Sequence, residues 1–297
     1  MGRWCVVVVG LAVVLGCGKK DPGGPPSGGG PPSTTFDIVP RYVGNPLPSH
    51  VSAVEDAVAL WKRVITGDIP DVTVTAASSN CGTGMPGRDE TIDDVVMWMR
   101  ITTIDGPGGV LGRGGPCVLR GGSGLPAIGV MELDSADMSN SFMRRVIIHE
   151  MGHALGFGTI WSNRSLLLGA GGSDPVFSGT QATARFNSVG GTNYSGAKVP
   201  VENTGDPGTR DSHWRESVFG TELMTGFINT ANDMLSVVSA GAMADLGYTV
   251  DFNAAEPYPL PIAAGAVRGQ QAQPAMVLGD DILRLPIHVL DEQPRPF

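Results

Sequence analysis

The sequence predicts an α+β fold, in which strands and helices share the first half of the chain and coil and helix dominate the second half. Segments 95–105 and 127–133 are rich in β-branched and apolar residues and are bounded by Gly, Pro and Asp, which is typical of strands. Residues 195–226 show little periodicity and contain many turn-forming residues. We therefore expect a sheet packed against helices, followed by a C-terminal subdomain of coil and helix.

Four segments have the spacing of apolar residues that indicates helices. The first, 50–68, is expected to pack through one apolar face and to end at Gly67. The second, 138–156, offers Ser139 or Asn140 as its N-cap. The third is a short helix within 174–191, and the fourth lies within 233–251 and has Gly247 as its C-cap.

The first 17 residues have the features of an export signal. Arg3 precedes an apolar run from Val6 to Leu15, which is shorter than the about 20 residues of a membrane-spanning helix. The sequence "VLGC" resembles the lipobox of bacterial lipoproteins, so we expect cleavage before Cys17 and lipidation of its side chain; an ordinary signal peptide cut nearby is the alternative. We thus expect an exported protein, anchored to a bacterial outer membrane or cell surface through Cys17, or secreted.

Composition divides the rest of the chain into three parts. Residues 18–35 are rich in Gly, Pro and Ser and have nothing to bury, which indicates a disordered tether. No second linker or repeat interrupts 36–260, so we expect one domain there and a C-terminal tail at 261–297. The net charge is -9, from 20 Lys+Arg and 29 Asp+Glu, with no basic cluster, so nucleic acid is not an expected partner.

The stretch "HEMGHALGFG", residues 149–158, places two histidines one helical turn apart. Positions i and i+4 of a helix differ by about 40° in direction and about 6 Å in height, so His149 and His153 can direct nitrogens at one Zn²⁺ ion. Glu150 points beside that ion, where a general base would act on a water molecule. Gly156 lets the chain leave the helix and turn back. The alternative, two buried core histidines, is costly without a partner.

A catalytic zinc site needs a third ligand. Thr159 stands where the metzincin motif H-E-x-x-H-x-x-G-x-x-H has its third histidine. Of the remaining histidines, His50 lies at the start of the first helix and His288 lies in the tail. His213, in a coil-like stretch 60 residues after the second motif histidine, is therefore the candidate.

The motif, the long insertion, the isolated histidine and "ELMTG" together resemble the leishmanolysin family of metzincin peptidases. The resemblance covers residues 140–250 well and residues 50–140 more weakly. It implies one Zn²⁺ ion per chain and the following roles: His149, His153 and His213 as ligands, Glu150 as the base, Gly156 as the helix-ending turn, and Met224 as the methionine of the Met-turn beneath the metal.

The resemblance also implies a fold. This is a twisted, mostly parallel sheet with an antiparallel edge strand, packed on the active-site helix. Strand 127–133 is expected to form the sheet edge that lines the cleft, where a peptide can pair as an added strand. Only the tether separates Cys17 from the domain, so we do not expect the pro-segment cysteine that keeps members of this family latent.

Two cysteines remain in the predicted domain, because Cys5 leaves with the signal and Cys17 is the predicted anchor. In an exported protein we expect Cys81 and Cys117 to form a disulfide. They are 36 residues apart, a loop for which the chain-entropy relation gives a stabilisation of about 3.8 kcal/mol. The alternative is that one of them is a free thiol on the metal.

We therefore expect a monomeric zinc-dependent metalloendopeptidase that hydrolyses extracytoplasmic proteins or peptides. One alternative is a gluzincin-type peptidase, with Glu202, Glu216 or Glu222 as the third ligand. The other is a non-catalytic zinc-binding surface lipoprotein or adhesin. Glu150 argues against the second alternative, because structural zinc usually has four protein ligands and needs no carboxylate beside an open position.

Overall fold

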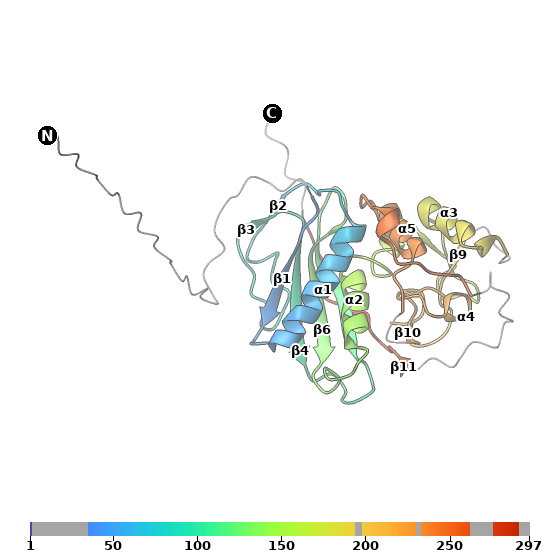
Figure 1. Cartoon of the computed structure of the whole chain (residues 1–297), viewed down its shortest axis with the longest axis horizontal. Helices are drawn as coiled ribbons and strands as arrows, with labels where there is room; N and C mark the ends of the chain where they lie inside the picture. The colour runs from blue at the N-terminus through green and yellow to red at the C-terminus, as the bar shows by residue number, and fades with distance from the viewer. Residues whose placement is uncertain (2–34, 194–197, 230–232, 262–275, 291–297) are drawn as a thin grey trace. The chain divides into compact units, whose positions relative to one another are not determined.

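A five-stranded mixed sheet is the framework of the protein (Figure 1). The computed structural model describes residues 1, 35–193, 198–229, 233–261 and 276–290. The strand order is β1 (Ile38–Val43), β4 (Val95–Thr102), β6 (Pro126–Asp134), β5 (Gly112–Leu119) and β12 (His288–Val289). Strands β1, β4 and β6 are parallel, β5 is antiparallel to β6, and β12 runs parallel to β5. This arrangement agrees with the predicted α+β class and mostly parallel sheet.

The prediction that strand 127–133 forms the sheet edge is wrong. This strand, β6, lies between β4 and β5 and is buried along its whole length. The strand beyond it, β5, has the sequence "GRGGPCVL", whose glycines and proline indicate a loop when only the sequence is considered. The structure explains one of these glycines, because a Cβ on Gly114 would lie 2.1 Å from the carbonyl oxygen of Glu150 in the helix above.

Two helices, α1 (Pro48–Val64) and α2 (Met143–Ala154), pack against each other, and α2 lies over β5 and β6 (Figure 1). The indole nitrogen of Trp61 in α1 donates a hydrogen bond to the carbonyl oxygen of Ile148 in α2, at 2.9 Å. Helix α1 ends three residues before Gly67, because the backbone of Ile65 is extended and pairs with Val250. The two helices and the sheet bury one large apolar core.

A second, smaller core lies on the other face of the sheet. Side chains alternate along a strand, so Val95 and Met97 of β4 join the core beneath the helices, whereas Val96 and Trp98 join the second core. Cys81 and Cys117 form a disulfide within this second core, with their Cα atoms 5.8 Å apart. The hairpin of β2 (Val72–Val74) and β3 (Glu90–Ile92) covers the same side.

The remaining elements form a C-terminal region with little sheet. Helix α3 (Thr180–Ser188) packs on α5 (Val237–Leu246), which begins at the N-cap Ser236. The C-cap of α5 is Gly247, as predicted. The other elements are short: η1 (Ser162–Arg164), β7 (Leu167–Leu168), β8 (Val176–Phe177), η2 (Gly191–Asn193), β9 (Val199–Pro200), α4 (Glu216–Phe219), β10 (Phe227–Ile228), η3 (Phe252–Ala254) and β11 (Met276–Val277).

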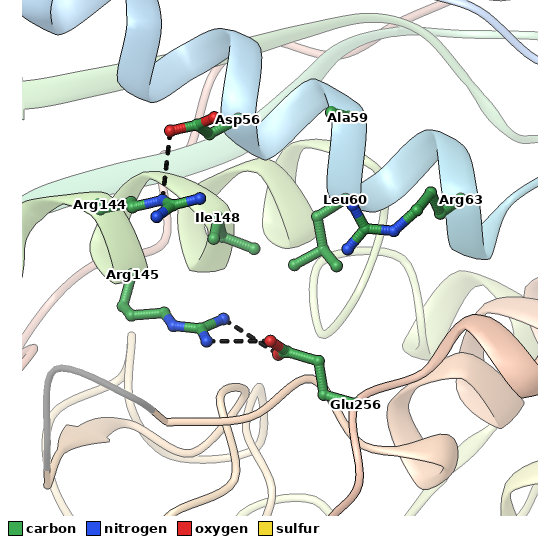
Figure 2. Close-up of a pocket in the computed structure, with 8 residues that line it drawn as sticks. All are labelled: Asp56, Ala59, Leu60, Arg63, Arg144, Arg145, Ile148 and Glu256. Carbon is green, nitrogen blue, oxygen red and sulfur yellow. Dashed lines mark hydrogen bonds and ion pairs between the residues drawn. The ribbon is translucent and has the colours of Figure 1, made fainter.

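An ion pair connects the start of α2 to the segment that follows η3. In the pocket between α1 and α2, the guanidinium of Arg145 donates to both carboxylate oxygens of Glu256, at 2.9 and 3.0 Å (Figure 2). Glu256 also accepts a hydrogen bond from the backbone amide of Leu235, at 2.8 Å. The pocket has none of the predicted site residues in its lining.

The structure describes almost none of the first 35 residues, but it does describe residues 276–290 near the other end of the chain. Apart from Met1 and Thr35, the predicted signal, Cys17 and the tether lie outside the described residues. None of the described helices is long and apolar enough to cross a membrane. Residues 276–290, in the segment predicted to be a tail, pair with β10 and along β5.

Candidate metal centre

Helix α2 carries the first two candidate ligands, His149 and His153, and both side chains are fully buried. The helix begins at Met143, later than the predicted N-cap at Ser139 or Asn140. The side chain of Asn140 instead accepts a hydrogen bond from the amide two residues later, in the turn before the helix, at 3.0 Å. The buried ligand face of α2 is therefore as predicted, but its start is not.

Gly156 ends the ligand helix in the left-handed conformation, with φ of +111°. Its amide donates to the carbonyl oxygen of His153, and the amide of Phe157 donates to that of Gly152, both at 3.0 Å. These two bonds form a Schellman motif, the geometry that favours glycine at this position. Thr159 turns away from the centre, because its hydroxyl donates to the carbonyl oxygen of His153 at 2.8 Å.

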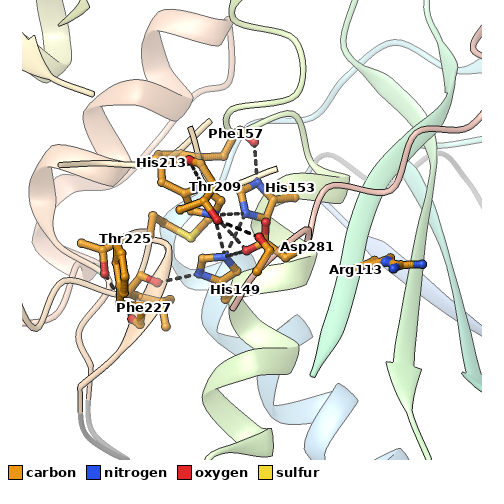
Figure 3. Close-up of polar contacts among 12 residues, drawn as sticks. Arg113, His149, His153, Phe157, Thr209, His213, Thr225, Phe227 and Asp281 are labelled. Carbon is orange, nitrogen blue, oxygen red and sulfur yellow. Dashed lines mark hydrogen bonds and ion pairs between the residues drawn. The ribbon is translucent and has the colours of Figure 1, made fainter. Parts of the chain in front are cut away.

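His213 joins the two helical histidines from a distant loop (Figure 3). Its Nε2 atom lies 2.9 Å from that of His153 and 3.2 Å from that of His149, and the two helical Nε2 atoms are 2.8 Å apart. Ligands at zinc–nitrogen distances of about 2.0–2.1 Å in a tetrahedral site lie roughly 3.3 Å from one another. The three nitrogens therefore surround a space that suits one metal ion.

The second nitrogen of each ring fixes the direction of the first. The Nδ1 atoms of His149 and His213 lie 2.6 Å and 2.9 Å from the carbonyl oxygens of Leu223 and Thr209. Nδ1 of His153 lies 2.8 Å from the carbonyl oxygen of the residue after Gly156. A carbonyl can only accept, so each Nδ1 carries the hydrogen and each Nε2 offers a lone pair to the centre. Three buried lone pairs this close repel unless a cation lies among them.

Asp281 is the fourth member of the cluster, and sequence reasoning missed it. Its Oδ2 atom lies 3.0 Å from Nε2 of His213 and 3.3 Å from Nε2 of His149, and its side chain is fully buried. The four ligand atoms lie within 4.8 Å of one another. Burial alone would raise the pKa of the Asp281 carboxyl, but the nearby histidines outweigh burial and hold it below its usual range.

The pKa values of His153 and His213 are shifted in opposite directions. Burial, helped by His149 and His213, lowers the pKa of His153 well below its usual range. Burial also acts to lower the pKa of His213, but the Asp281 carboxylate more than compensates and raises it. The cluster brings together three imidazoles and one carboxylate, a donor set typical of zinc.

Glu150 lies beside the cluster and is not one of its four members. Its side chain is fully buried, and neither carboxylate oxygen has a hydrogen-bond partner among the described residues. Burial, followed by the charge of Asp281, raises its pKa well above the usual range, while Arg113 acts in the other direction. A Cβ on Gly112 would lie 2.9 Å from Cγ of Glu150, so the glycine leaves room for this side chain.

Met224 is fully buried beneath the helix that carries the histidines. A Cβ on Gly152 would lie 2.9 Å from Cε of Met224 and 2.9 Å from the ring of Trp61. The carbonyl oxygen of Met224 accepts a hydrogen bond from the amide of Trp214 at 3.0 Å, which ties this turn to the loop of His213. The structure thus brings Met224 together with all three histidines.

The three glutamates that could serve a gluzincin-type site lie outside the cluster. Glu202 and Glu222 accept hydrogen bonds from the amides and hydroxyls around them. The carboxylate of Glu216 accepts from the side chain of Asn229. The third imidazole of the cluster comes from His213, and none of these three glutamates belongs to the cluster.

A comparison with protein-family models places most of the predicted domain in a known family. Residues 81–267, more than half of the chain, match the family model described as leishmanolysin, Peptidase_M8. The matched range contains the three histidines, Glu150 and Met224, whereas Asp281 lies beyond its end. A search of the curated proteins found no match.

Proposed function

The chain belongs to the leishmanolysin family of metallopeptidases, and on this basis we propose that it is a zinc-dependent endopeptidase with one Zn²⁺ ion per chain. The observation that carries the proposal is the convergence of His149, His153 and His213 next to the buried, unpartnered carboxylate of Glu150. Three neutral nitrogen ligands with an adjacent carboxylate are the parts of a hydrolytic zinc site.

The three histidines would hold the ion, each oriented by the carbonyl that its Nδ1 contacts. A bound zinc ion lowers the pKa of a water molecule and polarises the scissile carbonyl group. Met224 supports the centre from below by packing against Gly152 in the ligand helix. The ligand geometry therefore depends on the packing of α2 as well as on the histidines.

Glu150 is the proposed general base. Its burial without a hydrogen-bond partner leaves both carboxylate oxygens available to accept a proton from water. The protonated carboxyl can then deliver that proton to the leaving amine as the peptide bond breaks. Its raised pKa suits this exchange, because a carboxyl that binds a proton more readily can take a proton from water and then return it.

Extended peptide is the proposed substrate form. Strand β5 lies against the ligand helix, and its outer edge, which residues of the C-terminal segment occupy in this structure, is the edge that an added peptide strand would use once it is exposed. Export and anchoring through Cys17 remain part of the proposal on the strength of the signal-like N-terminus. The expected substrates are then proteins and peptides outside the cytoplasm.

A non-catalytic zinc site is the second candidate, and Asp281 is the observation that favours it. Four protein ligands are typical of structural zinc. Two features favour the peptidase: the family match, and a base-like carboxylate that a structural site does not need. The two candidates differ in what Glu150 does.

The test compares the full chain with Glu150→Gln at equal zinc content, measured by mass spectrometry of the metal, with casein as the substrate. Since Asp281 fills the fourth direction, the comparison is repeated with Asp281→Ala in both proteins. We expect zinc to stay bound and the rate to fall about 10² to 10⁴-fold without Glu150, the usual contribution of a general base. Glu55→Gln, on the exposed face of α1, is the matched control. Rates independent of Glu150 in both backgrounds would overturn the proposal.

A further inference from the structure

The C-terminal segment 276–290 reaches the metal centre from outside the region that matches the family. It begins with β11, which pairs with β10 in the loop after Met224, and ends with β12 on the outer edge of β5. Between these two strands it passes the histidine cluster at Asp281, whose side chain is fully buried. We call residues 276–290 the strap.

The strap occupies the sheet edge through its backbone. The amide of Gly114 in β5 donates to the carbonyl oxygen of Asp281 at 2.8 Å, and the amide of Leu283 donates to the carbonyl oxygen of Gly114 at 2.9 Å. Further along, the amide of Leu290 donates to the carbonyl oxygen of Leu119 at 2.9 Å. Both backbone groups of Gly114 that an added strand would use are thus already paired.

Two glycines, one in β5 and one in the loop that leads to His213, allow the strap to approach closely. On the β5 side, a Cβ on Gly115 would lie 2.2 Å from the carbonyl oxygen of Leu283. On the side of the loop that leads to His213, a Cβ on Gly208 would lie 2.7 Å from the Cα atom of Asp280. The hydroxyl of Thr209 in the same loop donates to the carbonyl oxygen of Gly279 at 2.8 Å. The strap therefore lies in direct contact with both β5 and this loop.

The strap is only partly built into the core. Leu278 is fully buried, and Leu283 and Leu285 pack at the margin of the second core. Val277, Ile287 and Val289 are exposed, and the last of these exposes 63% of its surface. The apolar side chains of the strap are thus divided between the core and the surface, so the strap is not buried along its whole length.

We propose that the strap is autoinhibitory, and that Asp281 is a fourth protein ligand that keeps the metal centre closed while the strap is in place. The inference rests on the proposed function, since it concerns the regulation of the same centre. A catalytic zinc site keeps one position open for water or substrate, whereas four protein ligands close it. The strap closes that position with Asp281 and blocks the peptide-binding edge at Gly114.

Release of the strap would open the metal centre and expose the peptide-binding edge of β5 at the same time. The carboxylate of Asp281 would leave the three histidines, and the amide and carbonyl of Gly114 would become free to pair with a substrate. The buried carboxylate of Glu150, which now faces the Asp281 charge, would gain access to water. The carbonyl oxygens that the Nδ1 atoms of the three histidines contact all belong to residues outside the strap.

Asp281→Ala in the full, zinc-loaded chain is the main test, and Asp280→Ala is its matched control. Asp280 is the neighbouring strap aspartate, and its carboxylate pairs with Arg284 rather than with the histidines. The first measurement is the affinity for acetohydroxamate, a small zinc chelator, by calorimetry. We expect binding to Asp281→Ala to be at least about tenfold tighter than to the wild type, a difference of about 1.4 kcal/mol in binding free energy. Binding to Asp280→Ala is expected to be unchanged.

Hydrogen exchange of the strap amides is a second measurement, independent of activity. Asp281→Ala and removal of zinc from the wild type are both expected to speed exchange of the Leu283 amide at least about tenfold. Gly115→Ala is expected to release the strap without changing any metal ligand, because the added methyl group would displace the strap at Leu283. Casein hydrolysis is expected to rise in both Asp281→Ala and Gly115→Ala.

The two proposals fail in different ways. If hydroxamate affinity and strap exchange are the same in Asp281→Ala as in the wild type, the strap is not inhibitory, although hydrolysis that depends on Glu150 would still support the peptidase. If folded Asp281→Ala loses its zinc, Asp281 is a structural ligand and the strap proposal is wrong. Faster strap exchange and tighter hydroxamate binding without any hydrolysis that depends on Glu150 would instead support the strap and overturn the peptidase.

Discussion

Gly152 and Met224 are so closely packed that helix α2 and the turn that contains Met224 have no free space between them at this point. A methyl group on Gly152 would lie 2.9 Å from Cε of Met224, between the two ligand positions of α2. This contact transmits any movement of the Met224 turn to His149 and His153. The packing beneath the metal is therefore a testable part of the centre.

Gly152→Ala is expected to lower both the free energy of unfolding and the affinity for zinc. The added methyl group must displace Met224 or Trp61, and overpacking of this kind costs about 1–3 kcal/mol. Urea unfolding and competition with a zinc chelator measure the two effects. Met224→Leu keeps the volume and is expected to cost less than about 1.5 kcal/mol; an equally stable Gly152→Ala would contradict the tight packing.

His213→Ala is expected to lose most of its bound zinc, because it removes one of three convergent nitrogens. His50→Ala is the matched control, since His50 lies on α1 outside the cluster. Metal content after dialysis against a weak chelator separates the two variants. Full zinc content in folded His213→Ala would remove His213 from the centre and reopen the search for the third ligand.

The disulfide is expected to stabilise the fold without serving the metal. Cys81 and Cys117 lie in the second core, on the face of the sheet opposite the helices. Replacing both with serine is expected to lower the free energy of unfolding by about 2–4 kcal/mol and leave zinc bound in stoichiometric amount. Loss of zinc from a folded double variant would show that one of these sulfurs serves the centre.

Glu216 makes stability depend on pH near neutrality. Burial raises its pKa from 4.5 to about 7, so the folded state binds a proton more readily than the unfolded state. Its contribution to stability is then present below pH 4.5 and is lost as the pH rises through 7. Because one pKa unit is about 1.4 kcal/mol, the change is on the order of 3 kcal/mol at most.

Glu216→Gln is therefore expected to be more stable than the wild type at pH 8, and to lose that advantage by pH 5. The measurement is urea unfolding of both proteins across this pH range. Glu55→Gln, which changes an exposed glutamate of α1, is expected to show no such trend. A constant difference between Glu216→Gln and the wild type at every pH would mean that Glu216 does not titrate in this range.

Most of the centre is predictable because its signals are local. The H-E-x-x-H spacing and Gly156 define a ligand helix and its end, and the small number of histidines leaves His213 as the third ligand. Asp281 gives no such signal, since it is one of 29 acidic residues in the chain. Its place depends on how the strap pairs with a distant strand, which no local pattern records.

In the fold, too, the elements with local sequence signals are predictable, whereas those that depend on distant contacts are not. Helix α5 and strands β4 and β6 are predicted well because apolar periodicity and a glycine C-cap are local properties. Strand β5 is not, because its glycines serve close contacts with α2 and the strap rather than turns. The sheet-edge prediction, which came from the family resemblance, is wrong because this glycine-rich strand lies outside β6.

The central claim is that Glu150, beside three histidines, makes this chain a zinc peptidase. The most direct measurement is the rate of casein hydrolysis by Asp281→Ala with and without the further change Glu150→Gln, at equal zinc content. The account predicts one zinc ion per chain in both proteins and a rate about 10² to 10⁴-fold lower without Glu150. Equal rates at equal zinc content would contradict it.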